Sequence, residues 1–334
     1  MNAPPAARRA RRLGLYGPLV TVAIGAVIWS GCWMWLRGQT LHRLSALAKR
    51  QAAAGGGFTW SGLRVYGYPF RLDLAFTDVA WTGPDGWGAS APSLLAETFV
   101  FAPDHWVAMA RNGATVLRPN GPASLSARVL RASLSGVGAS PPTFSLEGLG
   151  LIWAPRPGSA PTLFQSAAEL HVHTRAGPND QGAFYFEIDE ATPSPDGPLG
   201  RAPAPTTFVL DAIYTHASAL GGRGLSNALR SWSAASGKLD VRALRLDLGG
   251  AALRAAGKGL TLGGDGRLSG ALTGTLANSN LALATLAGDG LISPIAGRAA
   301  AAALPVTATP IALTFAAGRT HLGPIDLAAA PKLY

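Results

Sequence analysis

The sequence predicts a mainly β protein, with one large curved antiparallel sheet or two β-rich halves, few short helices and one transmembrane helix in front of them. A run of 24 residues without a charge, residues 13–36, lies near the N-terminus. From Phe58 onward apolar side chains recur at every second position, which is the spacing of a half-buried strand. Glycine-rich turn sequences such as residues 263–266 separate these runs and favour an antiparallel meander.

Residues 13–36 are predicted to form a transmembrane anchor, and residues 1–12 a basic cytoplasmic tail. As a helix with 1.5 Å per residue, these 24 residues cross the roughly 30 Å hydrocarbon core of a bilayer with some tilt. Trp33 and Trp35 lie near the end of the segment, where aromatic rings favour the membrane interface. Four basic residues follow the segment and four precede it, but the preceding four are concentrated in residues 8–12. This density favours a domain on the far side of the membrane.

Two other interpretations of the apolar segment are open. Residues 29–32 end like a lipoprotein lipobox, which would place a lipid on Cys32, but Trp29 stands where leucine is usual and the following residues stay apolar. A cleaved or twin-arginine signal is the second alternative, but no small-x-small cleavage site closes a short apolar region. We therefore expect an uncleaved signal anchor. Cys32 is the single cysteine, so no intramolecular disulfide is expected.

Residues 37–57 are predicted to be a membrane-proximal helix followed by a glycine linker. Leu41, Leu44 and Leu47 recur with helical spacing, and three consecutive glycines then end the helix.

The rest of the chain is predicted to form an N-terminal β half, residues 58–200, and a C-terminal β half, residues 201–334. Alternation is clearest at residues 70–77, where every second side chain is a large apolar one. We place the division in residues 191–205, because five prolines in this stretch are too many for a core strand.

The C-terminal half departs from plain alternation at several places. The apolar positions change from odd to even between Val241 and Leu244, which predicts a β-bulge near Ala243. Helical spacing from Leu225 to Trp232 and two alanine-rich stretches, residues 280–287 and 292–304, predict short helices that cover the sheet.

Most of the positive charge lies in the membrane-proximal part of the chain. The formal net charge is +10, but residues 1–50 contain eight of the 28 basic residues and none of the 18 acidic ones. The remaining 20 basic and 18 acidic residues give the domain a net charge of only +2. A near-neutral domain has no broad basic surface to neutralise phosphates, so no nucleic acid partner is expected. Charged residues make up 14% of the chain, against about 25% in an average soluble domain, so we expect an apolar surface that is covered or used.

No nucleophile-elbow, P-loop, dinucleotide-binding or helical zinc motif occurs, so we expect a non-enzymatic protein without a cofactor. One polar cluster is a candidate site. His171 and His173 alternate with apolar residues on one predicted strand, and Glu187 and Asp189 alternate with apolar residues on the next one. If the hairpin closes about Asp180, His171 faces Asp189 and His173 faces Glu187. These four side chains are candidates for a divalent metal site with metal-dependent activity, or for an acid–base patch. The alternative is an exposed face of opposite-charge pairs.

The run Gly67-Tyr68-Pro69-Phe70-Arg71 resembles the signature near the start of a family of anchored bacterial envelope proteins, domain of unknown function 2125. Later segments, including residues 263–272 and 331–334, resemble C-terminal blocks of that family. From the residues themselves we expect a structural role, with Pro69 at a strand start or edge and Gly67 in the turn before it.

An N-terminal anchor followed by short strands and glycine-rich turns is also similar to the AsmA-like superfamily of Gram-negative envelope proteins. Some members of that group form a curved sheet with an apolar inner face that handles lipid. The resemblance implies an inner-membrane protein with a periplasmic C-terminal domain and no catalytic residue to transfer. We expect binding of a lipid or another hydrophobic ligand in envelope biogenesis. The alternative is a scaffold or assembly factor that binds other envelope proteins through sheet edges.

Overall fold

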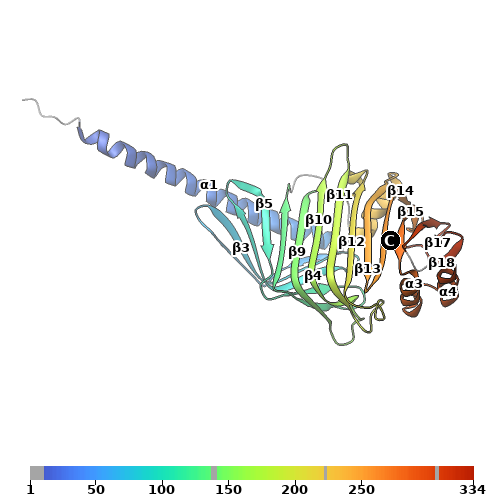
Figure 1. Cartoon of the computed structure of the whole chain (residues 1–334). Helices are drawn as coiled ribbons and strands as arrows, with labels where there is room; N and C mark the ends of the chain where they lie inside the picture. The colour runs from blue at the N-terminus through green and yellow to red at the C-terminus, as the bar shows by residue number, and fades with distance from the viewer. Residues whose placement is uncertain (1–10, 137–140, 222–223, 305–307) are drawn as a thin grey trace, which may run out of the picture.

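The computed structural model describes residues 11–136, 141–221, 224–304 and 308–334. Within these ranges a long N-terminal helix leads into eighteen strands that form one antiparallel sheet, with short helices inserted between the later strands (Figure 1). The predicted fold class, a mainly β protein with a large antiparallel sheet behind one apolar helix, is confirmed.

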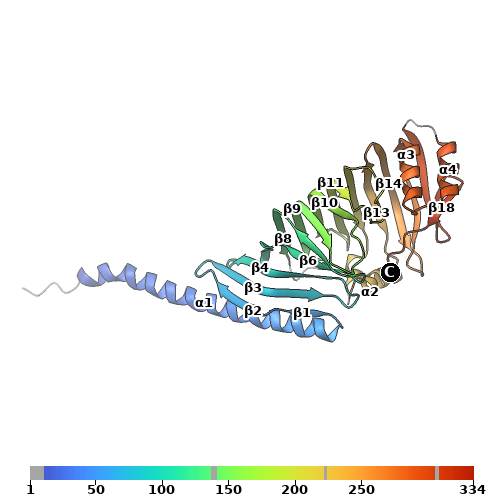
Figure 2. The same ribbon diagram turned by 90° about the horizontal axis from the view of Figure 1, so that it is seen from below.

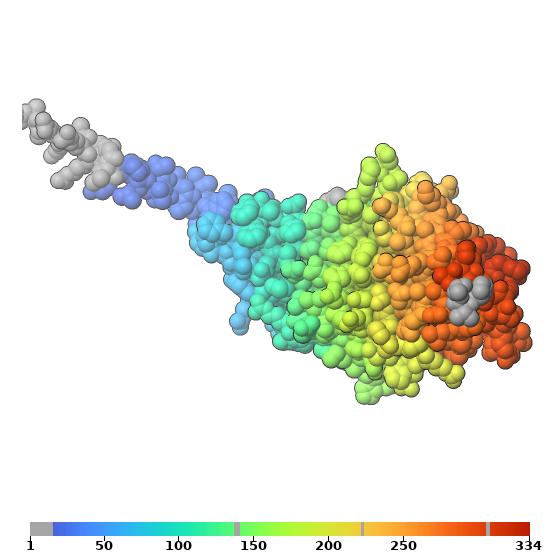
Figure 3. Space-filling view, in the orientation of Figure 1, coloured from blue at the N-terminus to red at the C-terminus, as the bar shows by residue number. Residues whose placement is uncertain are grey.

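The helix α1 (Arg11–Ala53) joins the predicted anchor and the predicted membrane-proximal helix into one continuous helix of 43 residues. Its length is about 64 Å at 1.5 Å per residue. The part from Tyr16 to Ala53 is long and apolar enough to cross a membrane. Residues 16–28 are exposed throughout, and Figure 3 shows this part as a rod that projects from the rest of the molecule.

The first half of the sheet begins beside α1. Both β1 and β2 pair with β3, and β3 pairs with β4. Two pairs of short strands, β5–β8 and β6–β7, then lie between β4 and β9. The bounds of these strands are β1 Gly57–Thr59, β2 Gly62–Tyr66, β3 Arg71–Thr82, β4 Gly88–Phe99, β5 Ala102–Met109, β6 Ala114–Leu117, β7 Ala123–Ser126, β8 Val129–Ser135 and β9 Thr143–Pro155.

From β9 to β18 each strand pairs with the next one along the chain. Figure 2 shows that the sheet curves along this path, with β3 beside α1 at one end and β18 at the other. The bounds are β10 Phe164–Ala176, β11 Gly182–Pro193, β12 Thr206–Tyr214, β13 Leu239–Leu248, β14 Ala251–Leu262, β15 Leu268–Ala277, β16 Thr309–Ala316, β17 Arg319–Leu322 and β18 Ile325–Ala329.

Three short α-helices among the described residues occur where the sequence predicts them, whereas one 3-10 turn was not predicted. Between β12 and β13 lie a 3-10 turn, η1 (Ala217–Leu220), and α2 (Leu225–Ala234). The helices α3 (Ser279–Gly288) and α4 (Pro294–Ala303) follow β15 and pack on β14 and β18. The start of α4 has a local cause, because the Ser293 hydroxyl accepts a hydrogen bond from the Ala296 N–H and Pro294 has the φ that a first helical turn needs.

The predicted bulge is also present. Asp211 pairs with Ala243 while the next residue, Ala212, pairs with Val241, so Arg242 is the extra residue on β13. The proline-rich stretch connects β11 to β12, and these strands pair directly with each other. The two predicted β halves therefore lie in one continuous sheet.

Candidate functional site

The strand registers define rows of side chains that cross the sheet, because directly opposed residues of paired strands point to the same face. One row contains no polar side chain in any of the thirteen strands that it crosses between β2 and β16. We call it the apolar row. It consists of Val65, Leu74, Ala96, Ala108, Ala132, Leu146, Val172, Phe186, Leu210, Leu244, Ala255, Gly274 and Ile311.

The two ends of the apolar row are covered by helices. Leu74 is 3% exposed and belongs to a core cluster that includes Leu44 of α1. At the other end, Ile311 is buried in a cluster with Leu283 of α3 and Ala300 of α4. The apolar row therefore lies on the face of the sheet that carries the helices.

The middle of the apolar row differs from its ends. Leu146, Val172, Phe186 and Leu210, on β9 to β12, are all only half-buried. Phe186 packs in a cluster whose members, among the described residues, come from strands and loops and not from helices. The middle of the helix-bearing face is thus an apolar surface that the protein itself covers incompletely.

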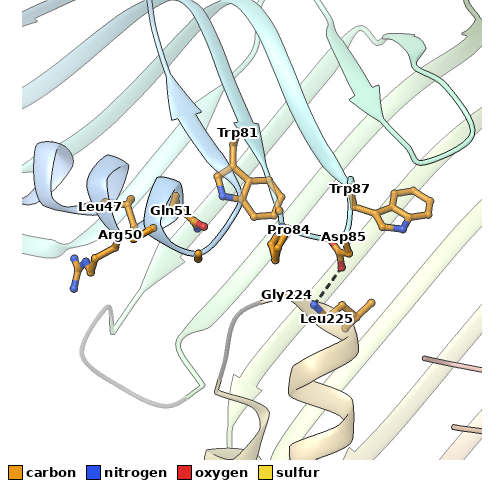
Figure 4. A pocket seen from close by; sticks show the side chains of 12 residues that line it. Leu47, Arg50, Gln51, Trp81, Pro84, Asp85, Trp87, Gly224 and Leu225 are labelled. Atoms are coloured by element: carbon orange, nitrogen blue, oxygen red, sulfur yellow. Dashed lines mark hydrogen bonds between the residues drawn. The ribbon is translucent and has the colours of Figure 1, made fainter. Parts of the chain in front are cut away.

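A cavity of about 850 Å³ opens at the end of this face where α1 ends (Figure 4). Leu47 of α1, Trp81 and Trp87 beside the β3–β4 turn, and Leu225 of α2 line it. The backbone N–H of Leu225 donates to Asp85 Oδ2 at 3.3 Å, which ties this turn to α2. The turn and α2 are far apart in the sequence, so this hydrogen bond joins two distant segments of the chain beside the cavity.

The signature residues 67–71 form the turn between β2 and β3 and bind α1. Trp29 Nε1 donates to Pro69 O and Trp33 Nε1 donates to Arg71 O, both at 2.8 Å. Trp33 also packs edge-on against Tyr68, with 5.7 Å between ring centroids, and is only 7% exposed. The sequence places Trp33 near the membrane interface but does not predict this contact, although Trp29 and Trp33 are spaced to lie on one helix face.

The geometry of the β2–β3 turn explains the residue types at two positions of the signature, residues 67–71. Gly67 has φ of 100°, and a Cβ on it would lie 2.9 Å from Arg71 O, so this position requires glycine. Arg71 then begins β3 and its guanidinium contacts Asp73 Oδ2 at 2.6 Å, which neutralises a carboxylate that is 1% exposed. Gly67 lies in the turn before β3, as expected, whereas Pro69 lies in the same turn, two residues before the strand start at Arg71.

The His/Asp/Glu candidates lie on the opposite face of the sheet, but the predicted register is wrong. His171 pairs with Glu187 rather than Asp189, and His173 pairs with Tyr185 rather than Glu187. Asp189 is opposite Glu169.

The error comes from the length of the hairpin loop. Gly182 still pairs with Ala176, so the loop contains residues 177–181 and is centred on Asn179 rather than Asp180. Each pair is consequently displaced by two residues, which keeps the face and changes the partner.

Each of the four candidates has its own hydrogen-bond or ion-pair partner. Among the described residues there is no group of three or more His, Cys, Asp or Glu side chains arranged to hold a metal ion. The partners are Glu169 Oε2 at 3.1 Å from His171 Nε2, Ser145 Oγ at 2.9 Å from His173 Nδ1, Tyr185 Oη at 2.8 Å from Glu187 Oε2, and Thr207 Oγ1 at 2.6 Å from Asp189 Oδ1.

The electrostatics of this polar face are those of cross-strand pairs. The hydrogen bond from Arg131 lowers the pKa of Glu147, which is opposite His171 on β9. Burial, together with the neighbouring Glu187, raises the pKa of Tyr185 to about 12. At neutral pH the tyrosine is therefore a neutral hydrogen-bond donor and Glu147 an ionised partner of Arg131.

Comparison with known proteins gives one result. A family model described as an uncharacterized protein conserved in bacteria (DUF2125) matches residues 33–331. None of the curated proteins and none of the solved structures gives a match, so the likeness to the AsmA-like superfamily stays a prediction. Since the family model covers most of the sequence, from Trp33 in α1 to Pro331 near the C-terminus, this chain belongs to the DUF2125 family.

Proposed function

We propose that this protein is a non-enzymatic, membrane-anchored binding protein whose apolar row holds the hydrocarbon part of a lipid or a similar hydrophobic ligand. The observation that carries the proposal is the apolar row, which crosses thirteen strands without a polar side chain and is half-buried in its middle. Contiguous apolar surface that a protein leaves partly uncovered commonly marks a binding site.

The dimensions of the uncovered part suit an acyl chain. Neighbouring strands are about 4.8 Å apart, so the stretch from Leu146 on β9 to Leu210 on β12 is about 14 Å long. One leaflet contributes about half of the roughly 30 Å hydrocarbon core, so an acyl chain in a bilayer extends over a similar length.

The proposal includes an uncleaved anchor in the inner membrane with the domain in the periplasm. The arginines within residues 8–12 support this orientation. Retention of the anchor is supported by the hydrogen bonds of Trp29 and Trp33 to the β2–β3 turn, because cleavage after the apolar segment would remove both of them.

Two substitutions on β12 test the proposal as a matched pair. Leu210 belongs to the apolar row, whereas the adjacent Val209 is half-buried on the opposite face. The full-length protein, purified from membranes, should carry phospholipid in native mass spectrometry. Leu210→Gln should reduce the bound fraction several-fold, and Val209→Gln should leave it unchanged.

Circular dichroism of both variants checks that the sheet is retained. Wild-type protein without bound lipid, or equal lipid on the two variants, would contradict binding at the apolar row. Recovery of one defined protein partner by crosslinking, with lipid absent, would instead favour the scaffold alternative.

A further inference from the structure

We propose that one end of the sheet is itself a membrane-contacting surface, formed by an aromatic rim that enters the bilayer beside α1. The aromatic rim consists of Tyr68 and Phe70 in the β2–β3 turn and of Phe99 and Phe101 at the β4–β5 turn. The apolar row and any ligand on it are not needed for this inference, which depends on α1 and these two turns alone.

The four rings are close together and open to their surroundings. The N–H of Val100 donates to Phe70 O at 2.9 Å, which joins the two turns. The rings of Phe99 and Phe101 stack with 5.1 Å between centroids. All four side chains are exposed, Phe70 to 61% and Phe101 to 70%. Exposed phenylalanines gathered at one edge indicate an apolar partner rather than water.

Contacts with α1 set the depth of the aromatic rim. Tyr68 Oη lies 2.9 Å from Ser30 Oγ, and Phe70 packs against Trp29 with 6.3 Å between ring centroids. Figures 1 and 2 both show these turns beside the middle of α1, well before its C-terminal end. Along the axis of α1, the rim therefore lies at the same height as residues 29–30, and these residues lie inside the apolar segment 13–36.

The helical rise converts this position into a depth. Ser30 and Trp29 come six and seven residues before Leu36, or about 9–10 Å along the helix axis. The segment of 24 residues is about 36 Å long, about 6 Å more than the hydrocarbon core. Even if this whole excess lies on the side of the domain, residues 29–30 are still about 3–4 Å inside the hydrocarbon boundary.

The chemistry of the rim fits this depth. Phenylalanine rings are stable in the acyl region, and the hydroxyl of Tyr68 has a hydrogen-bond partner in Ser30. The nearest charged groups along β3 and β4 pair with one another, since Arg71 contacts both Asp73 and Glu97. Each of these three charged side chains therefore has an oppositely charged partner beside the rim.

Insertion of the rim would fix the orientation of the domain. Strand β3 starts at the rim and runs beside α1, so its far end and the cavity at Trp81 point away from the membrane. The first residues of the apolar row, Val65 and Leu74, would then be close to the bilayer surface.

Depth-dependent fluorescence quenching of the full-length protein in liposomes tests the inference. In a Cys32→Ser background, Phe101→Cys and Trp87→Cys each provide one exposed position for an environment-sensitive NBD label. Trp87 is the control because it is exposed and lies at the opposite end of β4. The liposomes contain phosphatidylethanolamine and phosphatidylglycerol, with or without doxyl-labelled phosphatidylcholine.

We expect the label at position 101 to be quenched by doxyl lipid and protected from aqueous iodide, and the label at 87 to behave oppositely. Phe99→Cys gives a second rim position with the same expectation. Quenching of the rim labels by iodide, with no effect of doxyl lipid, would show that the rim lies in water and would overturn the inference.

Discussion

The end of the apolar row at α1 and its middle are built from the same kind of side chain but covered differently. At the α1 end, Leu74 and Phe76 pack under Leu44 and are almost fully buried. In the middle, Val172 and Phe186 point to the same face but stay half-buried, and no helix among the described residues belongs to the cluster in which Phe186 packs. The proposed function therefore assigns a mainly stabilising role to the α1 end and a binding role to the middle.

The largest expected effect is at the covered end. Leu74→Ala should lower the free energy of unfolding by about 2–5 kcal/mol, because it leaves a cavity in a packed cluster. Denaturant unfolding of the full-length protein in detergent, followed by circular dichroism, measures this. The exposed Thr77 on the same strand supplies a control, since Thr77→Ala should change stability by about 0.5 kcal/mol at most. Equal effects of the two changes would show that α1 does not bury this end.

In the middle of the row, the effect on stability should be smaller and the effect on ligand larger. Phe186→Ala should cost about 1–2 kcal/mol, since a half-buried side chain loses only part of the transfer free energy of a fully buried one. The same unfolding experiment measures this, and native mass spectrometry of the variant measures bound lipid. A loss of stability as large as that of Leu74→Ala would mean that the middle is as tightly packed as the end.

The contact between the β2–β3 turn and α1 can be weakened while an aromatic ring is kept at position 33. Trp33→Phe keeps much of the packing on Tyr68 and removes the hydrogen bond to Arg71 O, which should cost about 0.5–1.5 kcal/mol. We expect faster limited proteolysis at residues 54–57, between α1 and β1. Trp35→Phe is the control, since Trp35 is exposed on α1; equal proteolysis of the two variants would contradict the docking role of Trp33.

The smallest effect should be on the polar face, at the ion pair between Arg131 and Glu147. Its partners are both substantially exposed, so solvent screening limits its contribution to about 0.2–1 kcal/mol. The pKa of Glu147 is lowered in the folded state, so this contribution is present above the ordinary glutamate pKa of about 4.3 and is lost as the pH falls through the lower folded value. Arg131→Gln should remove this part of the acid dependence of unfolding; an unchanged pH profile would contradict the assignment.

Local patterns in the sequence predicted most elements of the fold. The bulge at Arg242, the helix from Leu225 and the two alanine-rich helices all follow from spacing within a few residues, and each is present. Alternation likewise predicted an antiparallel sheet, because each strand pairs mostly with its sequence neighbour.

The sequence did not predict what depends on distant contacts or on the length of one loop. The register at His171 was wrong because it depends on whether the turn centres on Asn179 or Asp180. Docking of Trp29 on Pro69 joins segments 40 residues apart, and no local pattern specifies that distance. The apolar row emerges only when the registers of many strand pairs are combined, so single-strand alternation indicated apolar faces but not their alignment.

Photo-crosslinking tests the central claim, that the middle of the apolar row is a ligand-binding surface, most directly. Full-length protein is reconstituted with a phospholipid that carries a diazirine in its acyl chain, irradiated, and digested for mass spectrometry. We predict crosslinks on β9 to β12 at row positions such as Val172, Phe186 and Leu210, and none at the adjacent polar-face residues Glu187 and Val209. Crosslinks confined to residues 16–36 of α1 would contradict the claim, because lipid would then touch only the apolar helix.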